Sequence, residues 1–198
     1  MAQPQRSDDR YTYADYITWD DDVRYELVDG VPYAMSAPTE DHQRLSGDLF
    51  RQLSTFLYGK SYQIRSAPYD VRLDADTDGD IVVQPDIVII CDRSKIGRRG
   101  CIGAPDMVIE ILSESSFTHD THTKFKLYQA AGVREYWIVN PFCQTIQAHI
   151  LDDGRYYTSS YSNDGDMPVH ILEGCIISLT DVFADTDDTD SPADEQAL

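Results

Sequence analysis

Three short apolar segments limit most strongly what this chain can fold into: IVVQPDIVII at 81–90, PDMVIEILS at 105–113 and REYWIVNP at 134–141. Each is rich in β-branched or aromatic residues and is bounded by turn-forming residues, a pattern typical of buried strands. Segments with helical spacing precede the first strand and separate the second from the third. We therefore expect a mixed α/β (α+β) fold in which a central sheet is flanked by helices.

Local signals predict the elements around these strands. Asp29-Gly30, between two valines, predicts a tight hairpin. Ser36 or Thr39 would cap a helix that runs to about Leu57. The apolar stripe of that helix consists of Leu45, Leu49, Leu53 and Phe56. A second helix is predicted after residue 113, and two further strands, QTIQAHIL and GRYYTSSYS, follow 134–141.

Charge is distributed unevenly along the chain. The sequence has 35 acidic and 16 basic residues, a net charge of −19. This charge repels phosphate backbones, and it is equally the composition expected of a protein adapted to high salt. The only basic cluster is the loop RSKIGRRG. We expect a flexible N-terminus at 1–10, one domain at 11–183 and an acidic disordered tail at 184–198.

Several classes of protein are not expected. No apolar stretch of about 18 residues predicts a membrane span, and the N-terminus lacks the apolar core of a signal peptide, so a cytoplasmic location is expected. The four cysteines form no CxxC pair, which argues against a zinc knuckle and predicts free thiols. The tyrosines near the N-terminus and at 156–161 would suit a homodimer interface, although scattered surface tyrosines explain them as well.

Two of the predicted strands carry an acid among apolar residues, Asp86 in QPDIVII and Glu110 in MVIEILS. A buried carboxylate needs a partner, a proton or a cation. One such acid alone is best explained as a strand end that faces water. Two in successive apolar strands favour a shared site, and Mg²⁺ is commonly held by one or two carboxylates plus waters. The pair therefore predicts a metal site.

The second predicted helix adds a lysine. At 100° per residue, Asp120, Lys124 and Tyr128 share the face that packs on the sheet, whereas Lys126 points to solvent. A core-facing lysine could orient a water nucleophile or neutralise phosphate charge. It could also simply pair with Asp120 one turn away.

Two upstream residues are weaker candidates on physical grounds. Glu26 lies in the first hairpin strand, where it could be a cross-strand partner of Arg24 or Arg72. His42 shares the stripe of the first long helix, and a lone histidine on an apolar face is more often a core residue than a ligand.

Taken in order, YELVDG, a histidine on the next helix, QPDIVI, PDMVIEILSESS, D…K…Y…AGV and EYWIVNP resemble the restriction endonuclease domain family of the Uma type, within the PD-(D/E)XK nuclease fold. The resemblance covers about residues 12–150. It implies a metal-dependent nuclease core in which Asp86, Glu110 and the Ile111 carbonyl hold Mg²⁺ (or Mn²⁺). It also implies Lys124 as the catalytic lysine, since Leu112 stands where many such nucleases have it.

The resemblance further implies that Glu26 and His42 lie at the rim of the site and that Tyr128 orients Lys124. Asn140 stands where the family usually has Asp. The sequence thus predicts a Mg²⁺-dependent endonuclease acting on nucleic acid, with DNA as the expected substrate. Two alternatives stay open: a binding or regulatory protein that keeps the nuclease fold without cleavage, and a hydrolase of small phosphate esters.

Overall fold

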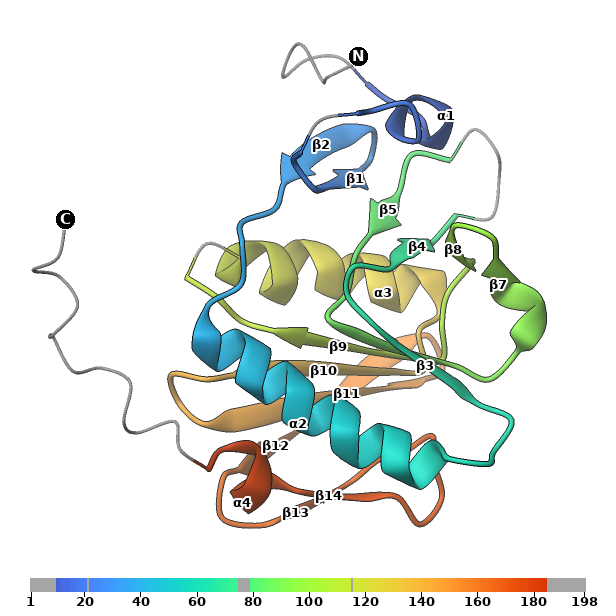
Figure 1. The fold of residues 1–198 in the computed structure, drawn as a ribbon. Coiled ribbons are helices and arrows are strands. Elements are labelled where there is room, and N and C mark those ends of the chain that lie inside the picture. The colour runs from blue at the N-terminus through green and yellow to red at the C-terminus, as the bar shows by residue number, and fades with distance from the viewer. Residues whose placement is uncertain (1–9, 21, 75–78, 115, 185–198) are drawn as a thin grey trace, which may run out of the picture.

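The computed structural model describes residues 10–20, 22–74, 79–114 and 116–184. Within them the chain forms two six-stranded sheets and one two-stranded sheet. The N-terminal sheet has the order β2-β1-β5-β4-β8-β7, and the central sheet has the order β12-β11-β10-β9-β6-β3 (Figure 1). The predicted fold class, a mixed sheet with flanking helices, is confirmed, but the strands are divided between two large sheets.

The strands of the N-terminal sheet are β1 (Tyr25–Val28), β2 (Val31–Ala34), β4 (Asp70–Arg72), β5 (Val82–Val83), β7 (Ile96–Gly97) and β8 (Gly100–Ile102). Those of the central sheet are β3 (Gln63–Ser66), β6 (Ile87–Ile90), β9 (Met107–Ile111), β10 (Glu135–Asn140), β11 (Thr145–Asp152) and β12 (Arg155–Ser162). The small sheet pairs β13 (Asp166–Pro168) with β14 (Ile176–Ser178). The helices are α1 (Tyr13–Tyr16), α2 (Glu40–Leu57), η1 (Arg93–Lys95), η2 (His119–Lys124), α3 (Phe125–Ala131) and α4 (Leu179–Val182).

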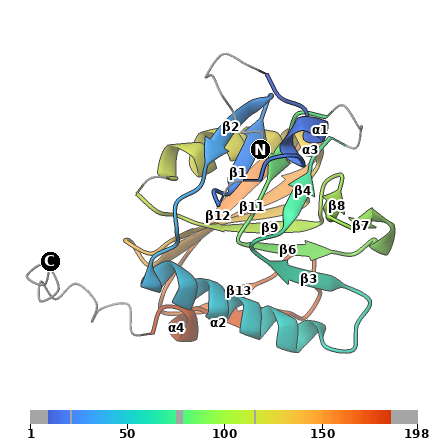
Figure 2. The same ribbon diagram turned by 45° about the horizontal axis from the view of Figure 1, so that its top comes forward.

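Helices α2 and α3 lie on opposite faces of the central sheet (Figures 1 and 2). The alternation of side chains along β6 explains this. Ile87 and Ile89 belong to the core that includes the α2 leucines, whereas Val88 and Ile90 belong to the core beneath α3. Burial of both faces accounts for the nearly continuous apolar sequence of the inner strands.

Most local predictions are confirmed. Asp29 and Gly30 both have positive φ (49° and 75°) and close the β1–β2 hairpin. Thr39, not Ser36, caps α2, where its side chain accepts a hydrogen bond from the His42 N–H. The stripe of α2 is buried as predicted except at Phe56, which is only partly buried; Leu57 lies in the core beside it.

One prediction about the strands is wrong. The segment IVVQPDIVII is not a single strand, because Gln84, Pro85 and Asp86 interrupt it. Its first half, β5, belongs to the N-terminal sheet, and its second half, β6, belongs to the central sheet. Proline has no N–H to donate to a ladder, which favours a break at this point. Asp86 therefore stands at the start of a strand rather than in the middle of one.

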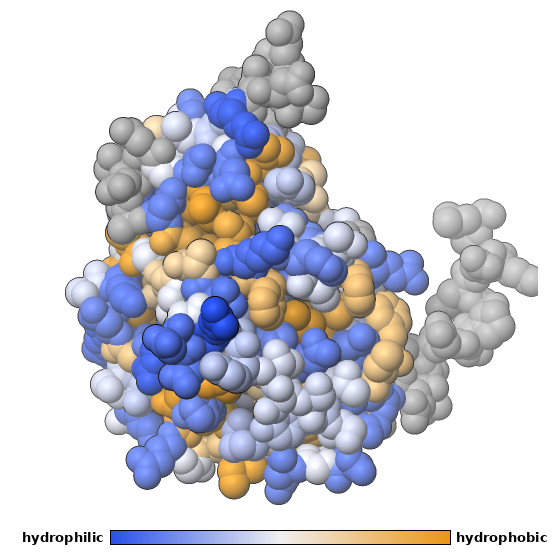
Figure 3. Space-filling model, turned by 180° about the vertical axis from the view of Figure 1, so that it is seen from behind, coloured by the Kyte–Doolittle hydropathy of each residue, from blue (hydrophilic) through white to orange (hydrophobic). Residues whose placement is uncertain are grey.

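The surface and the termini add little to the prediction of function. No helix in the described part of the chain is long and apolar enough to cross a membrane. On the face opposite α2, hydrophobic side chains lie in separate patches among hydrophilic ones (Figure 3). All four cysteines are free thiols, as predicted. The predicted N-terminal and C-terminal segments fall almost entirely at 1–9 and 185–198, outside the described residues, so the domain limits stay predictions.

Candidate active site

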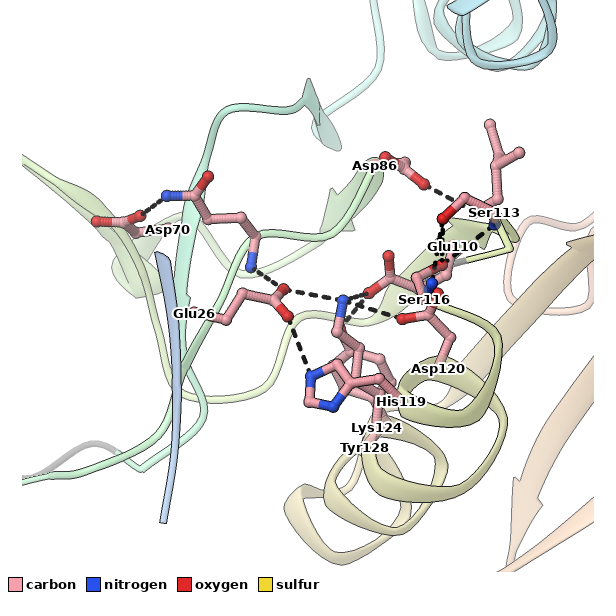
Figure 4. A network of polar contacts seen from close by, with 12 residues as sticks. Glu26, Asp70, Asp86, Glu110, Ser113, Ser116, His119, Asp120, Lys124 and Tyr128 are labelled. Atoms are coloured by element: carbon pink, nitrogen blue, oxygen red, sulfur yellow. Dashed lines mark hydrogen bonds and ion pairs between the residues drawn. The ribbon is translucent and has the colours of Figure 1, made fainter. Parts of the chain in front are cut away.

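A network of buried charges joins the two large sheets to the helix that follows β9 (Figure 4). Glu26 comes from β1, Glu110 from β9, and Asp120 and Lys124 from η2. All four side chains are buried, with 2–3% of each residue exposed. Charged residues are rarely buried to this extent unless they are paired or bind a ligand.

Lys124 is the centre of this network. Its Nζ lies 2.8 Å from Glu26 Oε1, 2.9 Å from Glu110 Oε1 and 3.2 Å from Asp120 Oδ1. Burial alone would lower the pKa of Lys124, but these three carboxylates raise it well above its usual value. The Lys124 ammonium group is therefore charged, which is the state needed for the role predicted from the sequence. The pairing with Asp120, predicted as an alternative explanation, is present together with the contacts to the two glutamates.

Glu110 is held through one of its two carboxylate oxygens. Oε1 accepts hydrogen bonds from Lys124 Nζ and from Tyr128 OH, the latter at 2.6 Å. Tyr128 thus donates to the same Glu110 oxygen to which Lys124 donates. Burial, together with the charges of Asp120, Asp86 and Glu26, outweighs Lys124 and raises the pKa of Glu110 well above its usual value. In the described contacts, Oε2 of Glu110 has no protein partner.

Glu26 uses both of its oxygens. Oε1 accepts from the Gln84 N–H at 2.8 Å and contacts Lys124, and Oε2 lies 3.2 Å from His119 Nε2. Although burial opposes its charge, Lys124, His119 and the Gln84 N–H lower the pKa of Glu26 to about 2. At 3% exposure Glu26 is a fixed, ionised part of the centre, and in this structure it does not lie at a rim.

Asp86 lies near Glu110 at the end of the β6–β9 ladder. The antiparallel β6–β9 ladder ends with the pair Ile87↔Ile109, and Asp86 and Glu110 are the next residue along each chain. Asp86 Oδ2 accepts the Ile111 N–H at 2.7 Å and lies 3.2 Å from His42 Nε2. The other oxygen, Oδ1, has no protein partner in the contacts of the described residues. The charge of Asp86 is one of those that raise the pKa of Glu110, so the two acids lie near each other, while their joint role as metal ligands stays a prediction.

His42 is not a core residue, and it lies next to Asp86. Its side chain is 16% exposed and contacts Asp86. Burial would lower the pKa of His42, but the hydrogen bond to Asp86, the charges of Asp86 and Asp120 and the Ile111 backbone raise it. A raised pKa favours the imidazolium form beside Asp86, which fixes this carboxylate from the side of α2.

The donor set suits a hard divalent cation. Asp86 and Glu110 each offer one uncommitted carboxylate oxygen. Three carboxylates, of Glu26, Glu110 and Asp120, surround one lysine, and the charge of Asp86 also acts on Glu110. A cation would offset this excess of negative charge. Nowhere among the described residues do three or more His, Cys, Asp or Glu side chains converge as a ready-made metal site. Magnesium often needs only one or two carboxylates and takes the rest of its ligands from water, so the residues fit Mg²⁺.

A second chain of polar contacts leads from Glu26 on β1 to Asp70 on β4 of the same N-terminal sheet. The Gln84 side chain donates to Asp70 Oδ1 at 3.0 Å, and Tyr16 OH donates to the same oxygen at 3.0 Å. Burial raises the pKa of Asp70, and it raises that of Tyr16 as well, with the Asp70 charge acting in the same direction. Gln84 thus bridges Glu26, through its N–H, and Asp70, through its side chain.

Sequence reasoning did not assign a site role to His119, Asp120, Gln84 or Asp70. Asp120 stood on the correct helical face and was interpreted only as a pairing partner. His119 contacts Glu26 and stacks near Tyr33, with ring centroids 4.7 Å apart. His119 and Lys124 are five residues apart, a spacing that places them on the same side of a π-helix. Apolar periodicity does not predict a π-helix, so the sequence did not place His119 beside Lys124.

Comparisons with known proteins identify the family and the fold. A family model described as "Uma2: Putative restriction endonuclease" matches residues 13–180. The uncharacterized protein slr1290 of Synechocystis sp. is 26% identical over 151 residues, which cover 74% of this chain and 78% of that protein. The crystal structure of a putative nuclease belonging to DUF820 from Anabaena variabilis superposes with a TM-score of 0.70 at 18% identity, covering 87% of this chain and 97% of that one.

Proposed function

Because the chain belongs to the Uma2 family, described as putative restriction endonucleases, we propose that it is a Mg²⁺-dependent endonuclease that hydrolyses phosphodiester bonds of nucleic acid. DNA is the substrate we expect, and Mn²⁺ would serve in place of Mg²⁺. The proposed metal ligands are Asp86, Glu110 and the Ile111 carbonyl. Lys124, Glu26, His42 and Tyr128 complete the proposed site.

One observation carries this proposal. Asp86 directly precedes β6, Glu110 lies in the neighbouring β9, the charge of Asp86 acts on Glu110, and each keeps one carboxylate oxygen clear of protein partners. Neither oxygen is among the fully buried polar atoms that lack a partner in the described part of the chain, so both are accessible to water or to a cation. The excess of buried carboxylates over cations supports the same conclusion.

Each supporting residue would have a defined task. The Ile111 N–H and His42 fix Oδ2 of Asp86, and Lys124 and Tyr128 fix Oε1 of Glu110, so that the two open oxygens are pre-positioned. Bound Mg²⁺ would lower the pKa of a coordinated water and neutralise phosphate charge. Glu26 keeps Lys124 charged and in place.

The proposed task of Lys124 is to orient the attacking water, and this imposes a condition. An ammonium group has three N–H donors, and Lys124 already has three carboxylate oxygens within 3.2 Å. One contact must therefore give way to water during catalysis. The contact with Asp120 is the longest of the three, at 3.2 Å, and is the one we expect to be replaced.

The test combines metal binding with cleavage. Asp86→Asn and Glu110→Gln should each remove the heat of Mg²⁺ or Mn²⁺ binding in calorimetry and abolish cleavage of single-stranded and duplex DNA and RNA. Asp164→Asn and Glu173→Gln, at exposed positions, are the matched controls and should leave both unchanged. Cleavage by Asp86→Asn that still depends on Mg²⁺ would exclude Asp86 as a central ligand.

The net charge and the saturated lysine favour a second candidate, a binding or regulatory protein that retains the nuclease fold without cleavage. DNA affinity depends on phosphate neutralisation, which a chain of net charge −19 supplies poorly. Metal binding by the intact protein together with no cleavage of any DNA or RNA form, at any salt concentration from 25 to roughly 500 mM, would support this candidate over the first.

A further inference from the structure

Two arginines of the basic loop RSKIGRRG line a small pocket in the N-terminal sheet together with a third arginine from β4. The pocket has a volume of about 180 Å³, and Arg72 from β4 and Arg98 and Arg99 from the β7–β8 turn line it. The rest of its wall consists of Tyr13, Asp70, Gly97, Gly100, Cys101 and Ile102. Three guanidinium groups against one carboxylate make this pocket locally positive, in contrast to the strongly acidic chain around it.

The pocket is held in shape by packing and backbone pairing. The Arg72 guanidinium stacks on the Tyr13 ring, 4.1 Å from its centroid. Strand β8 pairs in parallel with β4, with Gly100 beside Asp70. Gly100 has φ +147° and a Cβ there would lie 2.1 Å from the Asp70 carbonyl oxygen, so only glycine allows this close approach. The turn that carries Arg98 and Arg99 is thereby fixed against the strand of Arg72.

One residue separates this pocket from the proposed active site. Asp70, in the pocket wall, accepts from the Gln84 side chain at 3.0 Å, and the Gln84 N–H donates to Glu26 at 2.8 Å. Glu26 in turn contacts Lys124 at 2.8 Å. Gln84 and Pro85 directly precede Asp86 in the chain. The pocket and the acidic centre thus lie on either side of the Gln84 segment.

The chemistry of the pocket selects its ligand. Guanidinium groups bind phosphate through paired charge-assisted hydrogen bonds, and a pocket of about 180 Å³ is suited to one phosphate rather than to a base with its sugar. A polyanion that reaches the acidic centre needs local cations beside it, because the remainder of the surface repels it. The described chain offers this combination in the pocket of Arg72, Arg98 and Arg99.

We propose that Arg72, Arg98 and Arg99 form a phosphate subsite that holds the nucleic-acid backbone next to the phosphodiester in the active site. This inference rests on the proposed nuclease function and names how its substrate is held. The subsite supplies affinity without reading the base sequence, since phosphate contacts position a nucleic acid but do not specify it.

Binding in the absence of metal tests the subsite separately from cleavage. The probe is a fluorescein-labelled 12-nucleotide single-stranded DNA, titrated with the full chain in EDTA at several NaCl concentrations and followed by anisotropy. Arg98→Ala/Arg99→Ala should raise Kd at least 10-fold at 50 mM NaCl. It should also lower the slope of log Kobs against log[NaCl] by about 1.4, at about 0.7 for each lost phosphate contact. Circular dichroism checks that the variant is folded.

Arg51→Ala/Arg155→Ala is the matched control, because it removes the same charge from exposed sites outside the pocket. It should keep the wild-type slope and change Kd by less than 2-fold. Equal effects of the two double variants, or no binding by the wild type at 25 mM NaCl, would overturn the proposal. Inorganic phosphate at 10 mM should compete beyond chloride at equal ionic strength, and phosphate binding by a protein that does not bind the DNA at 25 mM NaCl would identify a free-phosphate site and overturn the assignment to a nucleic-acid backbone.

The two proposals fail in different ways. Arginine-dependent binding without Mg²⁺-dependent cleavage would contradict the nuclease and leave the subsite standing. Cleavage with binding that does not depend on Arg98 and Arg99 would contradict the subsite and leave the nuclease standing.

Discussion

At the scale of single residues, the stability of the site depends on the positive charge of Lys124. Three carboxylates are buried around it, and a buried charge that loses its partner keeps its desolvation cost without compensation. This crowding explains why the pKa of Glu26 is lowered whereas the pKa of Glu110 is raised. Glu26, with three donors, is stabilised as an anion, whereas Glu110, nearer to Asp86 and Asp120, is the carboxylate on which a proton or cation is favoured.

Replacing Lys124 tests whether its positive charge stabilises the three buried carboxylates. Lys124→Met keeps the length of the apolar stem and should lower the free energy of unfolding by about 3–5 kcal/mol at pH 7, measured by urea denaturation in EDTA. Lys126→Met, two residues away and exposed, is the control and should stay within about 0.5 kcal/mol of wild type. Equal stabilities of the two variants would show that Lys124 does not hold the buried carboxylates.

The sequence predicts those site residues that stand out within their own local segment. Asp86, Glu110 and Lys124 stand out because each is a charge in an apolar pattern, and the structure brings the latter two into contact and Asp86 near Glu110. Glu26 gives no such signal, because it lies in a short strand with ordinary alternation. Its burial arises only when β1 packs against η2, a contact between residues about 100 positions apart that local periodicity does not encode.

At the scale of elements, the same limit explains which strands the sequence predicts. Strands β9, β10 and β11 and the hairpin β1–β2 are continuous runs closed by clear turns, and they are found as predicted. Strand β13 and the short strands β7 and β8 were not predicted. Each has two or three residues, and they exist because a neighbouring strand offers unpaired backbone groups. Pairing of this kind comes from tertiary structure and not from propensity.

His149 connects three elements and gives the fold a pH dependence. It lies on β11, packs against Phe125 of α3 at a ring-centroid distance of 5.0 Å, and its Nδ1 lies 2.7 Å from Thr158 Oγ1 of β12. Burial lowers the pKa of His149 from 6.5 to about 4. The folded protein therefore keeps His149 neutral at pH values where the unfolded chain is protonated.

The consequence is a loss of stability in acid. Between pH 6.5 and about 4 the unfolded chain binds the extra proton, so the free energy of unfolding should fall as pH falls through this window. The contribution of His149 amounts to about 3 kcal/mol, at 1.36 kcal/mol for each pKa unit. His149→Gln should remove this part of the pH dependence in denaturation curves at pH 7 and 4.5. The exposed His122→Gln should keep it, and an unchanged difference between the two pH values in His149→Gln would contradict the assignment.

At the scale of the whole molecule, the site lies where two sheets meet, a feature that no single motif could predict. The break at Gln84-Pro85 sends β5 into the N-terminal sheet and β6 into the central sheet. The same break places Gln84 beside Glu26 and Asp86 beside the Ile111 N–H. The interruption of the longest apolar segment is thus what assembles the acidic centre and sets it next to the arginine pocket.

The net charge of −19 makes the stability of the whole molecule sensitive to salt. Raising NaCl from 0.1 to 1 M shortens the Debye length from about 10 to about 3 Å, which weakens repulsion between surface carboxylates far more than it weakens the buried pairs around Lys124. Relief of about 1–2 kcal/mol would raise Tm by roughly 2–8 °C in calorimetric scans. A variant with Asp22→Asn, Asp153→Asn, Asp164→Asn and Glu173→Gln, all at exposed positions, carries −19 + 4 = −15 and should show a smaller rise. Equal rises in the two proteins would mean that NaCl acts through general solvent effects, and that surface repulsion does not limit the stability of this fold.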